Sequence, residues 1–215
     1  MLEQLIQLTN SNDYKQNGGM RITEVLIQPW NKNEMKITLE TFIDNPTQEE
    51  VSQKQTWQIK CKHIMYNTSS KIHEPKIPHT QIKVFTEHPV LWNYGNSIYF
   101  SVDGVCDNIA EVVGDLFLVH DKACGNWVDF HWLFASLPET LKTQRQNQLA
   151  VPEKLFETYN GIFKKHKINV SINEHQKGEN DLVVLFFSSP NIYPDDYSFG
   201  QPYLVAKEFE EIQIR

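Results

Sequence analysis

Apolar and polar residues alternate through the first half of the chain, and this period of two predicts β-strands. The alternation is cleanest from Gln55 to Tyr66, where one face is mainly apolar and carries Trp57, Ile59, Cys61, His63 and Met65. The same pattern predicts further strands at Arg21–Gln28, Met35–Ile43, Gln81–Phe85 and Ser97–Val102. Strands with one apolar and one polar face are typical of antiparallel sheets with one buried side.

The period changes to a helical one after Gly104. Apolar residues then recur at helical spacing up to Ala123, with Asp107 as the expected N-cap and Gly125 as the expected end. The pattern Ser136-Leu-Pro-Glu139 predicts a short polar helix to about Gln146, and a third helix is predicted from Pro152. Before the strands, Leu2 to Leu8 predicts a short helix and Thr9 to Gly19 a loop.

Three more strands are predicted near the C-terminus, at Asn169–Asn173, Leu182–Ser188 and Tyr203–Ile214, with a turn at His175–Asn180. Strands and helices are therefore segregated along the chain. This order predicts an α+β fold with a mainly antiparallel sheet of about seven or eight strands, and a layer of two or three helices between about residues 107 and 167. We expect a single domain over 1–215. The alternative is a mainly β lobe over 1–104 and a lobe of helices and C-terminal strands over 105–215.

Composition narrows the choice of partners. The chain has 215 residues and a net charge of −7, which disfavours nucleic acid and anionic membranes as partners. The longest apolar run, Leu182–Phe187, is far shorter than the roughly 20 residues that span a bilayer. The three cysteines form no CxxC pair and the first residues do not resemble a secretory signal, so we expect a cytoplasmic protein.

Motifs of the common cofactor and catalytic classes are missing from the sequence, and we expect no cofactor, no metal and no catalytic residue. Two pairs of residues compete with this expectation. Cys61 and His63 share a face of a predicted strand, and His120 and Cys124 lie one helical turn apart. For both pairs a place in the core is the favoured interpretation, with His120 hydrogen-bonded to a backbone carbonyl.

Three loops concentrate aromatic and acidic side chains, which are enriched at binding surfaces. The candidate binding residues are Trp92 and Tyr94 in the loop 88–95, Trp127, Asp129 and His131 in the segment 125–134, and Tyr193, Asp195 and Asp196 in the loop 190–199. We hypothesise that the three loops converge into one cleft. In the segment 125–134 some aromatic rings must belong to the core, because they cannot all face one side.

The leading functional hypothesis is a non-enzymatic, cytosolic binding or interaction protein that uses these loops to bind a protein partner or a small ligand. One alternative is a hydrolase or transferase that uses His131 with Asp129, or Cys124 with His120. Another is a structural subunit of a homo-oligomer, for example a homodimer in which the final strands pair edge to edge. The charged residues of that strand, Lys207, Glu208, Glu210 and Glu211, disfavour such pairing.

Overall fold

The computed structural model describes residues 2–27, 33–44, 51–67, 81–104, 106, 108–143, 147–188 and 203–214. Within them the chain forms two compact units. Unit 1 combines residues up to Glu87 with the C-terminal residues from Asp181 onward, and unit 2 spans His88–Asn180. The chain therefore leaves unit 1 and later returns to it. These units have other boundaries than the two lobes considered from the sequence, which divide near Gly104. The expectation of a single domain stays a prediction.

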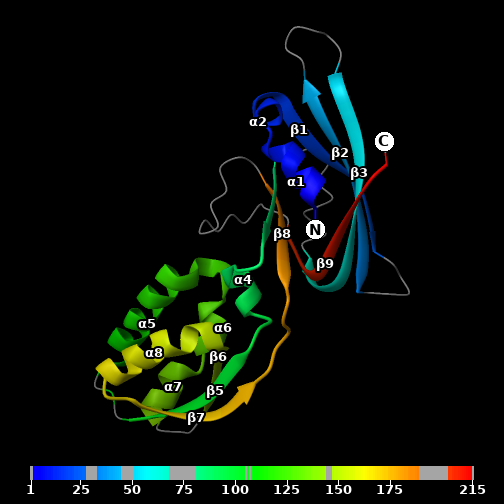
Figure 1. The fold of residues 1–215 in the computed structure, drawn as a ribbon. Coiled ribbons are helices and arrows are strands. Elements are labelled where there is room, and N and C mark those ends of the chain that lie inside the picture. Colours follow the sequence, from blue (N-terminus) through cyan, green and yellow to red (C-terminus); the bar gives the residue numbers. More distant parts are fainter. Residues whose placement is uncertain are drawn as a thin grey trace. The chain divides into compact units, whose positions relative to one another are not determined.

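Unit 1 is a curled antiparallel sheet with two short helices (Figure 1). The order of its strands is β1-β2-β3-β9-β8-β4. The elements are α1 (Glu3–Asn10), α2 (Asn12–Asn17), β1 (Gly18–Ile27), β2 (Glu34–Asp44), β3 (Val51–Asn67), β4 (Gln81–Phe85), β8 (Val183–Ser188) and β9 (Tyr203–Gln213). Alternate apolar residues of the strands meet the apolar side of α1 in one core, which includes Leu5, Ile37, Ile59, Leu185 and Phe209.

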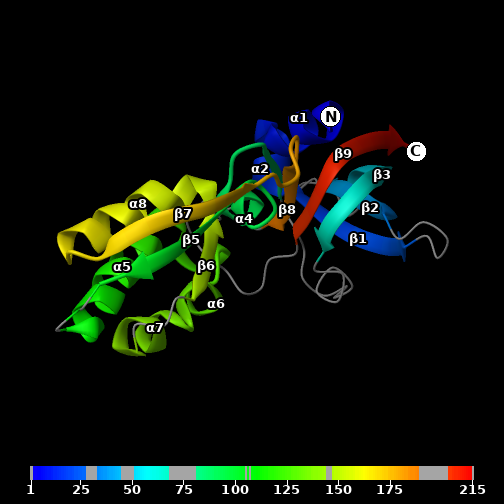
Figure 2. The ribbon, with the colours of Figure 1, turned by 90° about the horizontal axis from the view of Figure 1, so that it is seen from below.

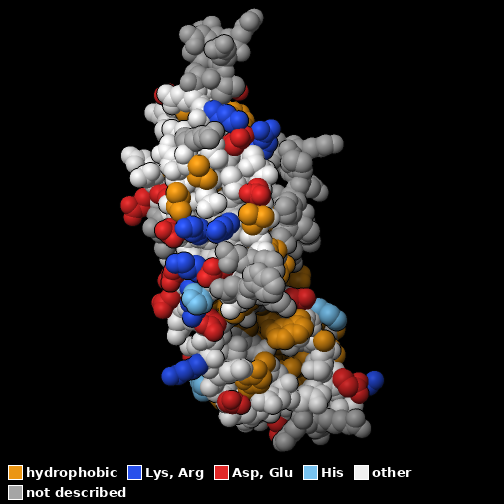
Figure 3. Space-filling view, turned by 90° about the vertical axis from the view of Figure 1, so that its right-hand side faces the viewer, with side chains coloured by type: hydrophobic (Ala, Val, Ile, Leu, Met, Phe, Trp, Pro, Cys, Tyr) orange, Lys and Arg blue, Asp and Glu red, His pale blue; other side chains and the backbone are white. Residues whose placement is uncertain are grey.

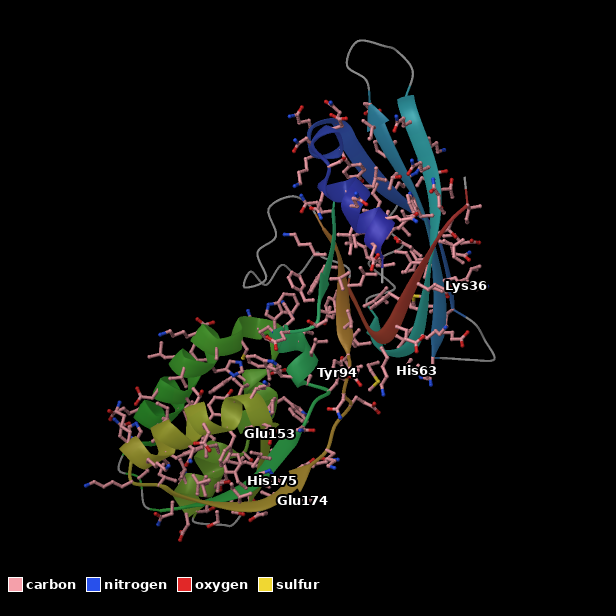
Figure 4. All side chains as sticks on the ribbon, viewed as in Figure 1. Lys36, His63, Tyr94, Glu153, Glu174 and His175 are labelled. Carbon is pink, nitrogen blue, oxygen red and sulfur yellow. The ribbon has the colours of Figure 1, made fainter. Side chains whose placement is uncertain are left out.

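The predicted alternation of β3 holds as far as Cys61 and then fails. Trp57, Ile59 and Cys61 are buried, but His63 has a positive φ of 55° and is exposed. A left-handed residue turns the strand, so the next inward-facing side chain is Ile64 instead of His63. The expectation that Cys61 and His63 share one face is therefore wrong, and Met65 is exposed as well. Figure 4 labels His63 on β3.

The final strand lies inside the sheet. β9 pairs with β3 over Leu204–Gln213 and with β8 over Tyr203–Ala206. Another strand therefore lies on each side of its first residues, which cannot pair edge to edge with a second copy. The carboxylate of Glu211, near the other end of β9, accepts hydrogen bonds from the backbone N–H groups of Gln4 (2.7 Å) and Leu5 (2.9 Å) and so caps the start of α1.

Unit 2 is a small antiparallel sheet of order β6-β5-β7 with helices packed on one face. Its elements are α4 (Pro89–Trp92), β5 (Ser97–Asp103), α5 (Ile109–Cys124), the 3₁₀ turn η1 (Gly125–Trp127), α6 (Phe130–Phe134), α7 (Leu137–Thr143), β6 (Gln148–Pro152), α8 (Glu153–Lys165) and β7 (Asn169–Gln176). Figure 1 shows α5 and α8 on the same side of β5 and β7, and Figure 2 shows α6 and α7 beyond β6. The apolar stripes of α5 and α8 meet the inner face of β5 in a second core.

The predicted α+β class with antiparallel sheets is confirmed. The helix expected after Gly104 is α5, which ends at Gly125 as predicted; Asn108 caps it, and Asp107 lies outside the described residues. Four short elements differ from the prediction: α2 and α4 fall in predicted loops, β6 lies between two predicted helices, and α6 lies in the aromatic segment. Among the residues described, no helix is long and apolar enough to cross a membrane.

Candidate functional site

His120 is fully engaged in the interior of unit 2. It lies on the buried side of α5, where its Nε2 is 2.9 Å from the carbonyl oxygen of Val128 and its Nδ1 is 2.6 Å from the hydroxyl of Tyr159 on α8. Because a carbonyl only accepts, Nε2 carries the proton and Nδ1 accepts from Tyr159. Burial lowers the pKa of His120, which keeps the ring neutral. The favoured interpretation, a core histidine bonded to a backbone carbonyl, is confirmed.

Cys124 contacts His120, but this pair lacks the features of an activated nucleophile. The Cys124 sulfur lies 3.5 Å from Nε2 and 3.6 Å from Nδ1, yet both ring nitrogens already have closer partners. Burial raises the pKa of the Cys124 thiol to about 12. A reactive cysteine needs the opposite, a partly exposed site that favours the thiolate. The geometry thus supports a structural role for the pair.

Two of the three predicted aromatic loops meet in unit 2. The side chain of Asn93 donates hydrogen bonds to the carbonyl oxygens of Val90 (3.1 Å) and Trp127 (2.8 Å), which ties α4 to η1. The rings of His88 and Trp127 pack edge to face at 4.7 Å. The third loop, with Tyr193, Asp195 and Asp196, lies outside the described residues, so its convergence with the other two stays a prediction.

The meeting of these loops buries most of their rings. Trp127 is buried, and Trp92 is partly buried against the core. Tyr94 is partly buried too, and its carbonyl oxygen accepts a hydrogen bond from the backbone N–H of Glu179 (2.8 Å). Figure 4 labels Tyr94 next to α4. These contacts build the end of unit 2, and the rings of Trp92 and Trp127 serve mainly its packing.

A different set of aromatic rings remains at the surface, on α5 and α6. Trp132 is 74% exposed and Phe117 is 49% exposed, and the ring of Phe117 packs edge to face on Phe130 at 5.4 Å. We call Phe117, Phe130 and Trp132 the aromatic surface. Trp132 lies on the same short helix as Phe130. Large apolar side chains that are exposed near one another commonly mark interaction sites. Figure 3 shows one side of the protein, on which exposed hydrophobic side chains gather over unit 2.

Acidic residues accompany the aromatic surface. Asp121 is exposed and follows Phe117 by one helical turn on α5, so the two side chains are neighbours. Asp129 is exposed and directly precedes Phe130; its carboxylate accepts a hydrogen bond from the backbone N–H of Trp132 (3.0 Å) and so caps α6. His131 is exposed on the same short helix. Asp129 and His131 are thus brought to this surface, but the hydrogen bond of Asp129 goes to the backbone and not to His131.

Sequence reasoning missed Trp132 and Phe117 as surface residues. Both belong to segments rich in apolar residues, and the pattern alone cannot tell which ring faces out of a five-residue helix. A signal was nevertheless present, because Asp129 is a good helix cap three residues before Trp132. A helix beginning at Phe130 places Leu133 and Phe134 inward and Trp132 outward, as the burial shows.

The structure also places the potential metal-ligating side chains, which the strand pattern puts on one face, apart from each other. Cys61 and His63 cannot bind one ion together, since Cys61 is buried and His63 points to solvent. Within the part of the chain that the structure describes, three such side chains come close together at one place, Glu111, Asp115 and His166. No family model matches the chain, and no curated protein is significantly similar to it.

Proposed function

We propose that this chain is a non-enzymatic interaction protein that binds a protein partner through the aromatic surface on α5 and α6. The observation that carries the proposal is the 74% exposed ring of Trp132 on the same short helix as Phe130, whose ring contacts the half-exposed Phe117. Tryptophan is among the residues most enriched at the positions that dominate binding energies in protein interfaces. Helices held by a packed core also present such rings in a fixed geometry, which lowers the entropic cost of binding.

The charge of this surface indicates the chemistry of the partner. Asp121 and Asp129 flank the aromatic rings, and the whole chain carries a net charge of −7. We therefore propose a partner with an apolar anchor surrounded by basic residues. Complementary charge accelerates association and disfavours wrong partners, and its effect weakens as salt is added.

The compartment proposed is the cytoplasm. Cys61, Cys106 and Cys124 are all free thiols, and two of them are buried in the two cores. Free thiols of this kind suit a reducing compartment, whereas secreted domains commonly use cysteines in disulfides.

The test compares Trp132→Ala and Phe117→Ala with Ile172→Ala, a control residue on β7 that is as exposed as Phe117, at 49%. Each purified variant is immobilised and exposed to lysate of cells that express the protein, and the bound proteins are quantified by mass spectrometry at two salt concentrations. We expect the same basic proteins to be captured by the wild type and Ile172→Ala, and to fall at least about tenfold with Trp132→Ala.

Equal capture by the wild type and Trp132→Ala contradicts the proposal. Light scattering of the wild type over a range of concentrations examines the homo-oligomer alternative. If the chain associates with itself and Trp132→Ala restores the monomer, the aromatic surface binds a second copy and the basic partner is wrong.

A further inference from the structure

Glu111, Asp115 and His166 lie together where α5 passes the end of α8. Glu111 and Asp115 are one helical turn apart on α5, and His166 is the residue that follows α8. One potential ligand atom from each of the three lies within 4.8 Å of the others. The three side chains therefore converge from two helices that are far apart in sequence.

The present contacts show how this cluster is held together. The Oδ2 atom of Asp115 is 2.7 Å from Nε2 of His166 and 2.6 Å from the ammonium nitrogen of Lys165. Two nitrogen groups thus share one carboxylate oxygen. The Lys165 hydrogen bond, followed by that of His166, holds the pKa of Asp115 below its ordinary value. Asp115 and Glu111 also interact with the Lys165 charge and raise its pKa. Lys165 is the resident cation of the cluster.

The same donors suit a divalent transition metal. Carboxylate oxygens bind Zn²⁺ at about 2.0–2.2 Å and imidazole nitrogens at about 2.0–2.1 Å, which places neighbouring ligands roughly 3.3 Å apart around a tetrahedral ion. The distance of 2.7 Å between Oδ2 of Asp115 and Nε2 of His166 is somewhat shorter than this. The upper limit of 4.8 Å on the distances among the three ligand atoms is somewhat longer. Small rotations of the exposed Glu111 side chain and of the partly exposed Asp115 side chain bridge both differences, while His166 is largely buried.

We propose that Glu111, Asp115 and His166 form a binding site for a divalent transition-metal ion of the Zn²⁺ class, in which the ion replaces the Lys165 ammonium. The ion replaces the positive charge of the Lys165 ammonium between the two carboxylates. It also replaces the hydrogen bond between His166 and Asp115. It joins α5 to α8 and stabilises unit 2, because a ligand that binds only the folded state shifts the unfolding equilibrium. The site is independent of the aromatic surface.

Lys165 supplies the sharpest test, because it competes with the ion. Its replacement by an uncharged side chain, Lys165→Met, is expected to tighten Zn²⁺ binding about tenfold, since the carboxylates then lack a counter-charge. The matched control is Lys164→Met, the adjacent exposed lysine in the same helical turn, which leaves the affinity unchanged. Binding is measured on the full chain without a histidine tag, by competition with a chromophoric chelator, and thermal unfolding is followed in parallel.

Ligand variants complete the experiment. Glu111→Gln is expected to weaken Zn²⁺ binding at least about tenfold. Glu111 is exposed, so this variant keeps the fold, and Glu157→Gln on the exposed side of α8 is its control. His166→Gln is expected to abolish one-to-one binding and the Zn²⁺-dependent rise of the melting temperature. The proposal is overturned if neither the wild type nor Lys165→Met binds Zn²⁺ with one-to-one stoichiometry, or if His166→Gln and Glu111→Gln bind it as the wild type does.

Discussion

The reactivity of the three thiols separates an interaction protein from a cysteine-dependent enzyme. Burial raises the pKa of the Cys124 thiol from an ordinary 9.0 to about 12, and that of Cys61 likewise to about 12. Such a change lowers the thiolate fraction near neutral pH about 1,000-fold. In disulfide exchange a thiolate becomes more nucleophilic as its pKa rises, with a coefficient of about 0.5. Over this change in pKa the rate constant of the thiolate therefore increases about 30-fold. The net reduction from ionisation alone is therefore about 30-fold, and burial of the sulfur slows attack further.

The assay is reaction of the native chain with an aromatic disulfide reagent at a pH of about 7.5, followed by the absorbance of the released thiolate. We expect one thiol, that of the half-buried Cys106, to react promptly, and the other two to react at least about 30-fold more slowly. In Cys106→Ser the prompt phase disappears. In urea all three thiols react at the rate of an unfolded chain. A prompt phase that persists in Cys106→Ser and maps to Cys124 would falsify the structural role of Cys124 and revive the Cys124–His120 enzyme.

Three further predictions concern stability, measured by urea unfolding. Tyr14→Phe raises the free energy of unfolding by about 1 kcal/mol, because the hydroxyl of Tyr14 is buried and makes no hydrogen bond to any of the residues that the structure describes. An unchanged or lower value contradicts this. Glu211→Ala lowers it by about 1–2 kcal/mol through loss of the α1 cap, whereas Glu210→Ala, its exposed neighbour, has little effect; equal effects of the two remove the capping role. Gly178→Ala lowers the free energy of unfolding by more than about 2 kcal/mol, because the added Cβ would overlap the Gly95 carbonyl group. Its control, Gly161→Ala in α8, has open space around it and raises the free energy of unfolding by about 0.5–1 kcal/mol. An unchanged stability of Gly178→Ala contradicts the close packing.

The elements that the sequence predicts well are those whose pattern repeats several times. In α5 four turns repeat one apolar stripe, and Gly125 ends it with a positive φ, so both its type and its end follow from local chemistry. The short elements α2, α6 and β6 have five or six residues and therefore too few repeats to fix a period. The strand at Gln148–Pro152 also contains a proline, which argues against a strand in isolation and is tolerated because β6 is an edge.

Other errors come from long-range structure that no local pattern encodes. The inward-facing residues change from Cys61 to Ile64 on β3 and from Phe209 to Ala206 on its neighbour β9. These residues are paired across the two distant strands, so both strands change their inward face at the same place. Pairing of β9 inside the sheet depends likewise on contacts between segments that are far apart in the sequence. The exposed ring of Trp132 depends on the exact start of a five-residue helix. These features depend on contacts within the folded units, and local sequence patterns do not predict them.

The core of unit 2 explains why its surface suits recognition. His120 joins α5 to α8 through Tyr159 and to the segment before α6 through Val128, and Asn93 joins α4 to the same segment at Trp127. The aromatic side chains that composition singles out are thus divided between two roles. Trp127 and the buried rings fix the positions of α5 and α6, and Phe117 and Trp132 project from these helices into solvent. A surface fixed in this way loses little conformational freedom when a partner binds, and so more of the apolar burial contributes to affinity. The physical basis of the proposed interaction therefore lies as much in the buried polar network as in the exposed rings.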